Sequence, residues 1–382
     1  MIGGHGGNIH DLARRLGCRP ADIVDLSSNV NPLGPPPGLT DYLSRHLDVI
    51  GTLPEVDNQG IIQDYAATLG VSPDGVLAGN GSTQFIYSIP GVLKVKKALI
   101  VGPTYSDYAD ACRLHEVPFT FHLCREEQEF QPDIDRIEKN MAGADAVFIC
   151  NPNNPTGALI PAQRLKRLCL RNPNVRFIVD ESYLPFVSGG ETNSLVACGL
   201  QNVLVLLSIS KIYRIPGLRI GFLVAAPATI AAFAECMWPW SVNSLGQAAV
   251  RFLTAAGPAL GAFVAETRSY LDQQRQELRQ RLHPIPGLKL YPSTTSFMLI
   301  RLPEGLPAAT VFSQLAKERI LIRNCSNFQG LSDRFIRISP KGPEANRRVT
   351  ERLAELAAQR SRVEAVSQPR PPGPAGAAHN QK

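Results

Sequence analysis

The stretch VLVLLSISKIYRIPGLR (residues 203–219) decides the fold class, because in it an apolar run is followed directly by polar side chains. The run VLVLL is continuous and branched, which is typical of a strand with both faces covered. Ser208 and Lys211 come directly after it, and Arg219 follows. Similar runs occupy residues 97–101, 146–150 and 176–179, with helical patterns between them. The sequence therefore predicts an α/β fold with a parallel sheet covered by helices on both faces.

Polar side chains follow the other predicted strands as well. GPTY (102–105), NPNNPTG (151–157) and DESY (180–183) each come after one of these runs. Because parallel sheets bind ligands outside the carboxyl ends of their strands, these segments are expected to meet at one edge. GNGST (79–83) precedes a helical pattern starting at Gln84, where backbone amides suit a phosphate, although a simple capping turn is an open alternative.

The composition excludes several other classes of protein. With 44% apolar and 19% charged residues the chain is expected to be soluble and globular, and a net charge of +6 without basic runs argues against nucleic-acid binding. The longest uncharged apolar stretch, residues 220–234, is too short for a membrane span and predicts a strand followed by a helix. The eight cysteines include no C-x-x-C pair and, with no apolar signal core at the N-terminus, favour a cytoplasmic protein with reduced thiols. No histidine has an obvious partner set, so no metal site is expected.

Changes in composition and hydrophobic pattern along the chain predict four parts. Residues 1–38 are turn-rich and proline-rich and are expected to form an N-terminal arm. Residues 39–262 carry the alternating strands and helices of a large domain. Residues 263–366 predict a smaller α+β domain, and residues 367–382, rich in Pro, Gly and Ala, predict a disordered tail.

Taken together, these segments resemble the fold-type I pyridoxal-phosphate enzymes, the aspartate aminotransferase-like superfamily, from about residue 5 to about residue 360. The resemblance implies a large domain with a mostly parallel seven-stranded sheet, a small α+β domain, pyridoxal 5'-phosphate as cofactor and a homodimer. In many relatives a Tyr-Pro pair sends a tyrosine into the partner's phosphate site. Here the pair is Leu53-Pro54, so this trans contact is in doubt.

The resemblance also implies roles for the residues at the strand ends. Lys211 would hold the cofactor and carry protons, and Asp180 would keep the ring nitrogen protonated. Asn154 and Tyr183 would contact the phenolic oxygen, with Lys211, Asp180 and Tyr183 forming the catalytic set. Tyr105 would stack on the ring, with a plain core tyrosine as the alternative. The cofactor phosphate would be held by Gly81, Ser82, Thr83, Ser208, Ser210 and Arg219.

Substrate-binding residues are implied mainly by the two ends of the chain. Arg337 matches an arginine that commonly binds the substrate carboxylate, and Arg323 lies where the histidinol-phosphate branch binds a phosphate. Two such arginines suggest a phosphorylated amino acid. HGGNI (5–9), DLSSNVNPLG (25–34) and RNCSNFQGL (323–331) resemble the threonine-phosphate decarboxylase branch. Further candidates for substrate binding are His5, Gly6, Asn31 and Asn154, with a flexible terminus and a turn asparagine as the alternatives for the arm residues.

The predicted reaction is decarboxylation of L-threonine O-3-phosphate to (R)-1-amino-2-propanol O-2-phosphate in cobalamin biosynthesis. A histidinol-phosphate-type aminotransferase is the alternative reaction, and a non-catalytic module that binds pyridoxal phosphate is the remote one. Selectivity between threonine phosphate and serine phosphate stays open, because one methyl group is worth only about 1–3 kcal/mol.

Overall fold

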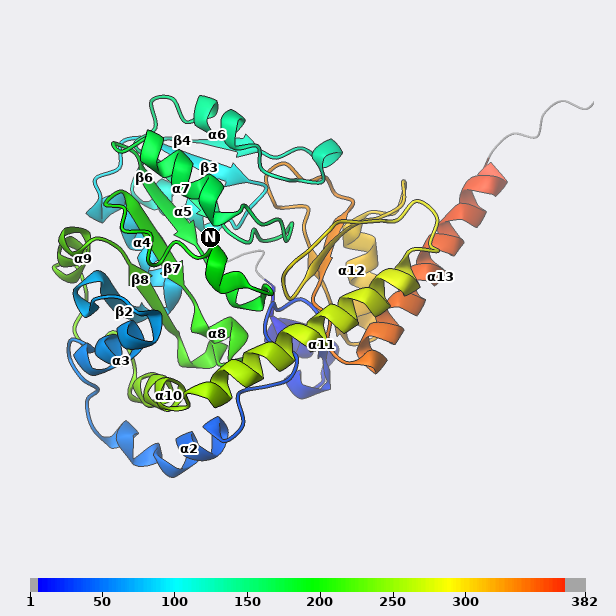
Figure 1. The fold of residues 1–382 in the computed structure, drawn as a ribbon. Helices are drawn as coiled ribbons and strands as arrows, with labels where there is room; N and C mark the ends of the chain where they lie inside the picture. The colour runs from blue at the N-terminus through cyan, green and yellow to red at the C-terminus, as the bar shows by residue number, and fades with distance from the viewer. Residues whose placement is uncertain (1–5, 368–382) are drawn as a thin grey trace, which may run out of the picture.

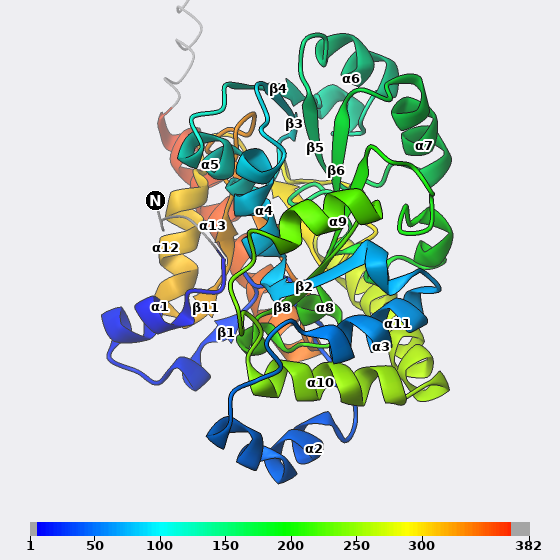
Figure 2. The same ribbon diagram turned by 90° about the vertical axis from the view of Figure 1, so that its left-hand side faces the viewer.

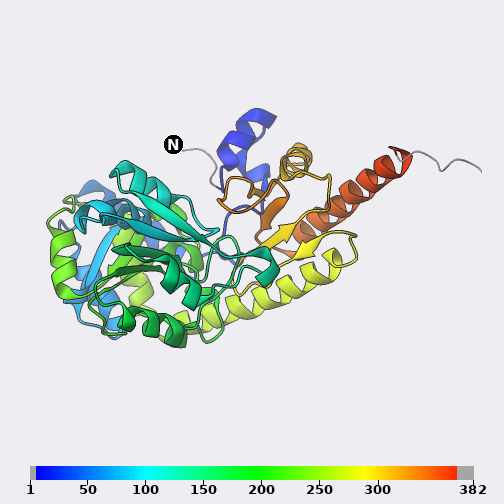
Figure 3. The same cartoon turned by 90° about the horizontal axis from the view of Figure 1, so that it is seen from above.

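The computed structural model describes residues 6–367, and its largest element is a seven-stranded sheet (Figure 1). Most of its strands are continuous apolar runs buried on both faces, because helices lie above and below them (Figure 3), whereas the edge strand at residues 119–123 is partly exposed. In spatial order the strands are β2 (Val76–Asn80), β8 (Ile220–Val224), β7 (Val203–Leu207), β6 (Arg176–Asp180), β5 (Ala146–Cys150), β3 (Ala98–Gly102) and β4 (Phe119–Leu123).

Strand direction brings the predicted ligand-binding segments to one edge of this sheet. β7, β6, β5, β3 and β4 are parallel, whereas β8 runs antiparallel to both β7 and β2. The start of β8, preceded by Arg219, therefore lies at the same edge as the ends of the other six strands. The mostly parallel seven-stranded sheet of the resemblance is confirmed.

Besides the single turn α8 (Ile209–Ile212), eight α-helices lie within residues 39–255 and surround the sheet or follow its strands. The predicted helix before Gly70 is confirmed, since α3 ends there on a glycine at φ 66°. The helix expected from Gln84 begins earlier, at Gly81, because the glycine's left-handed backbone turns the chain directly from β2 into the helix. These helices are α2 (Leu39–Arg45), α3 (Gln59–Leu69), α4 (Gly81–Val92), α5 (Asp107–Leu114), α6 (Ile134–Asn140), α7 (Ala162–Arg171), α9 (Pro227–Ala234) and α10 (Ser244–Ala255).

A smaller antiparallel sheet lies beside the large one and has a separate apolar core. Its order is β12 (Arg323–Asn324), β13 (Phe335–Ile338), β10 (Met298–Arg301) and β9 (Lys289–Leu290). Three helices accompany it: α11 (Pro258–Leu282), α12 (Ala308–Lys317) and α13 (Pro343–Ser367). α11 runs from the large sheet to the small one and joins the two parts (Figure 1). The mixture of helices and short strands expected after residue 263 is therefore observed, while the domain boundaries at 38, 262 and 366 stay predictions.

The N-terminal segment packs on the small sheet's side of the molecule (Figure 2). It contains α1 (Ile9–Leu16) and β1 (Val24–Asp25), and β1 pairs in parallel with β11 (Ile320–Leu321). Leu12 and Ile23 form a small apolar cluster with Leu321. The sequence did not indicate this pairing, because a two-residue strand has no periodicity and its partner lies far along the chain. Most of the predicted disordered tail, residues 368–382, lies outside the described residues.

Within the described residues no single helix is both long and apolar enough to cross a membrane. α10 and α11 satisfy such a test only as a pair, and the chain bends by 95° between them.

Candidate active site

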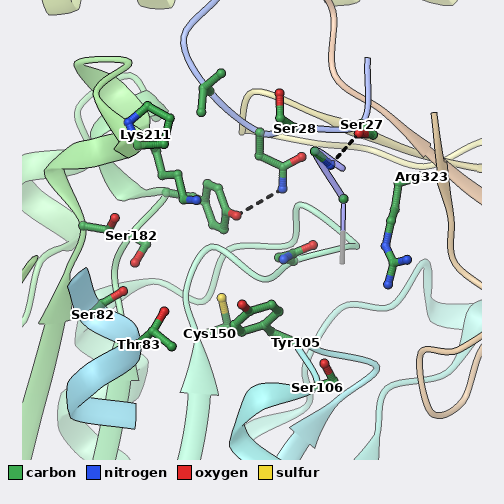
Figure 4. Close-up of a pocket in the computed structure, with 18 of the residues that line it drawn as sticks. Ser27, Ser28, Ser82, Thr83, Tyr105, Ser106, Cys150, Ser182, Lys211 and Arg323 are labelled. Atoms are coloured by element: carbon green, nitrogen blue, oxygen red, sulfur yellow. Dashed lines mark hydrogen bonds between the residues drawn. The ribbon is translucent and has the colours of Figure 1, made fainter. Parts of the chain in front are cut away.

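A cavity of about 490 Å³ opens at the carboxyl edge of the large sheet, between it and the small sheet. We call it the active-site cavity. Lys211 enters it from the large sheet, and Arg323 enters from the opposite side (Figure 4). Of the predicted site residues, the cavity is lined by Gly6, Gly81, Ser82, Thr83, Tyr105, Asn154, Asp180, Tyr183, Ser208, Lys211, Arg219, Arg323 and Arg337.

Lys211 lies on α8 (Ile209–Ile212), the single helical turn that follows β7. Burial lowers the pKa of its amine, and the neighbouring cations Arg219 and Arg337 lower that pKa further, against the opposing effect of Asp180. The surroundings therefore favour the neutral amine, which is the nucleophilic form of lysine.

Asp180, the last residue of β6, is held by two donors. Its Oδ1 accepts from the Ser182 amide at 3.0 Å, and its Oδ2 accepts from the Tyr108 hydroxyl at 2.8 Å. Tyr108 is on α5, is 1% exposed, and was not singled out from the sequence. Its position three residues after Tyr105, in the first turn of the helix that follows β3, was the available signal. These bonds fix the carboxylate's orientation inside the cavity.

Tyr183 and Asn154 each form a hydrogen bond outside the large sheet, Tyr183 with the arm and Asn154 with the small sheet. The Tyr183 hydroxyl accepts from Asn29 Nδ2 at 3.1 Å, and burial raises its pKa to about 12. Asn29 in turn accepts from the Ser339 hydroxyl at 2.9 Å. Asn29, which the sequence reasoning missed although it lies in DLSSNVNPLG, therefore connects the arm to both sheets.

Tyr105 follows β3 and packs edge-to-face on Tyr108, with ring centroids 5.9 Å apart. Its ring lies beside Cys150 along the floor of the cavity (Figure 4). An aromatic surface is therefore present next to Asp180.

The start of α4 and Arg219 form an anion cradle. Gly81 has φ 74°, a left-handed conformation that favours glycine, and a Cβ there would lie 2.6 Å from Arg219 Nη2 and would displace the guanidinium. A Cβ at Gly221 would lie 2.3 Å from the Ser82 amide nitrogen, so β8 too must carry glycine where it passes α4. The Ser82 and Thr83 hydroxyls face the cavity from this helix start (Figure 4).

Ser210, unlike the other residues predicted to hold the cofactor phosphate, does not face the cavity. Its hydroxyl donates to the Ile220 carbonyl at 3.1 Å, and the residue is not part of the cavity lining. Ser208, two residues earlier, does line the cavity. The hydroxyl of Ser210 thus ties α8 to β8, and the expected phosphate contact is not what this geometry shows.

Arg337, on β13, is 4% exposed and lies against the large sheet. Its Nη2 donates to the Ser27 carbonyl at 2.8 Å, Nη1 donates to Asn154 Oδ1, and buried Nε has no hydrogen-bond partner within residues 6–367. Its guanidinium lies 5.2 Å from the centre of the Phe297 ring. Burial lowers its pKa, against the opposing effects of Cys325, Tyr183 and Asp25, and among the described residues no carboxylate is within ion-pair distance of it.

Arg323, on β12, is held only by neutral partners. Its Nη2 donates to Asn327 Oδ1 at 2.8 Å, and its guanidinium lies 5.0 Å from the Phe328 ring centre. Burial lowers its pKa to about 10, and the positive charge of Arg337 contributes in the same direction. In the part of the chain that the structure describes, no carboxylate is within ion-pair distance of Arg323 either.

The arm contributes backbone and serine groups to this side of the cavity. The Gly7 amide donates to the Ser27 hydroxyl at 2.7 Å, and a Cβ on Gly6 would lie 2.6 Å from the Ser27 carbonyl oxygen. Glycine at position 6 therefore allows the first residues of the arm to pack directly on Ser27, farther along the same arm. His5, predicted to bind substrate, lies outside the described residues.

The prediction that Asn31 binds substrate is wrong, because the residue does not reach the cavity. It is fully buried outside the cavity lining, and its Nδ2 donates to the Ile212 carbonyl at 2.9 Å and to the Thr267 hydroxyl at 2.7 Å. Its amide also donates to the Lys211 carbonyl at 2.9 Å. Asn31 thus supports the turn that carries Lys211. Leu53, the site of the missing tyrosine, is 73% exposed and not part of the cavity lining.

No group of three or more His, Cys, Asp or Glu side chains suited to a metal ion occurs within residues 6–367.

Comparison with known proteins relates this cavity to one family. A family model described as aminotransferase class I and II matches residues 21–353. Threonine-phosphate decarboxylase of Salmonella typhimurium is 32% identical over 92% of this chain and 96% of its own length. The adenosylcobalamin biosynthesis bifunctional protein CobDQ of Leptospira interrogans is 29% identical, but the chain spans only 41% of that protein.

Similar proteins also include aminotransferases. Histidinol-phosphate aminotransferase of Methanothermobacter thermautotrophicus is 28% identical over 92% of this chain and 93% of its own length. Among solved structures, L-threonine-O-3-phosphate decarboxylase from Porphyromonas gingivalis superposes with a TM-score of 0.77 at 29% identity, covering 90% of this chain and all of that one.

Proposed function

The chain belongs to the aminotransferase class I and II family, a family of pyridoxal-phosphate-dependent enzymes, and we propose that it decarboxylates L-threonine O-3-phosphate. The product would be (R)-1-amino-2-propanol O-2-phosphate, and cobalamin biosynthesis would be its setting, as the name of the Leptospira interrogans relative suggests. The observation that carries the proposal is a pair of guanidinium groups, Arg323 and Arg337, that share one cavity with Lys211 and have no acidic partner among the described residues.

The donor set of the cavity fits pyridoxal 5'-phosphate. The glycine cradle at Gly81, with Ser82, Thr83, Ser208 and Arg219 around it, suits the phosphate dianion, because amides, hydroxyls and one cation converge there. At the other end of the ring, Asp180 would hold the pyridine nitrogen. Tyr183 and Asn154 would contact the phenolic oxygen, Tyr105 would lie against the ring, and the Lys211 amine would hold the cofactor covalently.

When bound, pyridoxal phosphate supplies an electron sink for the charge left at the Cα of an amino acid. The chain's own groups supply binding, orientation and proton transfer. Asp180, fixed by the Tyr108 hydroxyl, would keep a proton on the pyridine nitrogen. The Lys211 Nζ, whose lowered pKa eases proton exchange, would pass the proton it carries to Cα once the carboxylate has left as carbon dioxide.

The two arginines favour a substrate with two anionic ends. Buried cations without acidic partners are costly, and an anionic ligand relieves that cost. Arg323 with Asn327 offers a charge-assisted site for a phosphate at the mouth of the cavity. Arg337, whose Nε is left without a partner, lies deeper and suits the carboxylate end. A phosphorylated amino acid matches this separation of charges.

The same arginines could serve amino transfer, in which the Cα hydrogen rather than the carboxylate leaves. Two observations support decarboxylation. Gly6 and Gly7 of the arm lie on Ser27 next to Arg337, as expected for the HGGN arm of that branch. Identity to threonine-phosphate decarboxylase of Salmonella typhimurium also exceeds that to the histidinol-phosphate aminotransferase of Methanothermobacter thermautotrophicus, 32% against 28%. The latter similarity makes amino transfer the second candidate.

Product analysis tests the proposal. We expect carbon dioxide and an amino alcohol phosphate from threonine phosphate with no keto acid present. Rapid transfer of the amino group of histidinol phosphate to 2-oxoglutarate, without carbon dioxide from threonine phosphate, would establish the second candidate instead. Cofactor absorbance that depends on Lys211, without turnover of either substrate, would support a non-catalytic module.

We also propose that the protein is a homodimer. Its surface carries exposed apolar side chains on two segments joined by a hydrogen bond from the Trp240 amide to the Val56 carbonyl, at 3.1 Å. Exposed patches of this kind typically mark interfaces. They comprise Leu47, Ile50, Leu53, Val56, Trp238 and Trp240. Light scattering should give twice the chain mass at assay concentration, and an active monomer would contradict this.

A further inference from the structure

A second cavity, of about 450 Å³, lies across the large sheet from the active-site cavity. We call it the rear cavity. Side chains alternate between the two at the strand ends: Asp180 and Ser182 line the active-site cavity, whereas Glu181 between them lines the rear one. Likewise Ser208 faces the active site, and its neighbours Leu207 and Ile209 face the rear cavity. None of the residues of the rear cavity has a part in the function proposed above.

Glu181 is the unusual group of the rear cavity. It is 1% exposed, and its carboxylate accepts from the Ser194 hydroxyl at 2.6 Å and from the Leu195 amide at 2.7 Å. Among the described residues no Lys, Arg or His forms an ion pair with it. Burial accordingly raises its pKa to about 7. A buried carboxylate held only by neutral donors is stabilised by any cation that can reach it.

The other charged groups of the rear cavity cancel each other. Arg268, on α11, pairs with Glu191 at 2.6 Å and also donates to the Pro185 carbonyl at 2.8 Å. The charge of Glu181 is therefore left without a counter-charge, and the lining as a whole carries one excess negative charge when Glu181 is ionised.

The remaining lining is apolar and aromatic. Tyr65 and Tyr213 lie near Glu181, and within the described chain neither hydroxyl has a hydrogen-bond partner. Tyrosine rings can also attract a cation over their faces. A volume of this size, with apolar walls and a few polar groups, is typical of small-molecule sites. The walls come from α3, α10 and α11 and include Leu69, Val250, Leu253, Leu260 and Val264.

From these contacts we infer that the rear cavity is a second binding site, for a small organic cation whose charged head pairs with Glu181 and whose apolar body lies against α10 and α11. Tyr213 is the residue directly after the short helix α8, two positions beyond Lys211. An occupant would therefore touch the back of the turn that carries the active-site amine.

Calorimetric titration of the holoenzyme with benzyltrimethylammonium tests this site. This probe has a permanent charge, an aromatic body and no N–H group, so it cannot react with the cofactor. At pH 8 we expect saturable binding, and at pH 6 at least fivefold weaker binding, because Glu181 is then mostly protonated. Benzyl alcohol, which lacks the charge, should bind at least tenfold more weakly.

Two variants locate the binding. Glu181→Gln should weaken binding of the probe at least tenfold at pH 8 and abolish the difference between pH 8 and pH 6. Val264→Trp should fill the cavity and block binding, whereas saturating inorganic phosphate, which would occupy the active-site cations, should not compete. Equal binding of benzyl alcohol, an affinity independent of pH in the unmodified protein, or competition by phosphate would overturn the inference. None of these measurements requires turnover, so the proposed reaction can fail while this site stands.

Discussion

The two halves of the active-site cavity are built in different ways. The cofactor half consists of the strand ends of the large sheet and the first residues of the helices that follow them. Asp180, Lys211 and the cradle at Gly81 are held there by the neighbouring backbone. The substrate half consists of Arg323 and Arg337 from the small sheet and of Ser27 from the arm. One half is thus a property of a single sheet, and the other exists only where three separate segments meet.

This difference suggests a division of labour. Chemistry common to the whole family belongs on the rigid edge of the large sheet. The choice of substrate depends on groups whose relative positions can vary with the packing of the arm and the small sheet. Perturbing the first half should therefore abolish turnover, and perturbing the second should change affinity.

The largest effect is expected for Lys211→Ala. Removal of the amine takes away both the covalent attachment of the cofactor and the proton carrier, so carbon dioxide release should fall by at least about 10³-fold. The far-ultraviolet circular dichroism and the melting temperature should stay close to those of the unmodified protein. Turnover above trace level would show that the cofactor half is wrongly assigned.

A smaller but large effect is expected for Arg323→Ala. Loss of a partly buried charge partner should weaken threonine phosphate binding by about 2–5 kcal/mol, roughly 30- to 5000-fold in KM. The turnover number should change far less. Arg347→Ala is the matched control, because Arg347 is an exposed arginine of α13 paired with Glu344 and Glu351. Equal effects of the two variants would mean that only net charge matters.

The pH profile tests whether the halves are coupled. The pKa of the free Lys211 amine lies below its usual value, so the neutral amine, and with it the rate at which cofactor-free protein takes up pyridoxal phosphate, should increase as pH rises through that lowered pKa. Arg337 of the substrate half contributes to the lowering. Arg337→Met should therefore move the rising limb to higher pH, as should Arg219→Met. An unmoved limb in Arg337→Met, measured from initial rates of cofactor uptake by the cofactor-free protein, would show that the two halves are not coupled electrostatically.

The smallest effect is expected for Tyr108→Phe. This variant removes one donor to Asp180 and leaves the ring in place, at a cost of about 1.5–3 kcal/mol for a hydrogen bond to a charged group. We expect a fall in kcat of roughly tenfold or more with little change in KM and a shifted cofactor absorbance. Tyr270→Phe, which removes a hydroxyl bonded to the Lys341 carbonyl, is the control and should leave both unchanged.

The same contrast explains what the sequence could and could not predict. The strands that lead into Asp180 and Lys211 are continuous apolar runs with polar residues directly after them, so both the sheet and its edge could be predicted. Ser210 and Asn31 lie in the right segments, but which way a side chain points in a turn depends on the packing around it. Tyr108 and Asn29 were missed because their roles arise from contacts between distant segments.

The pairing of β1 with β11 has a consequence for the order in which the molecule forms. Val24 lies near the start of the chain and its partner Ile320 near the far end, so this contact cannot form on the ribosome until nearly the whole chain has been made. The large sheet has no such requirement, since its strands all come earlier. The cofactor half can therefore mature first, and the segment that carries Ser27 must wait for the small sheet before Arg337 gains its partner. During synthesis the protein passes through a stage at which its cofactor could be bound before its substrate can be recognised.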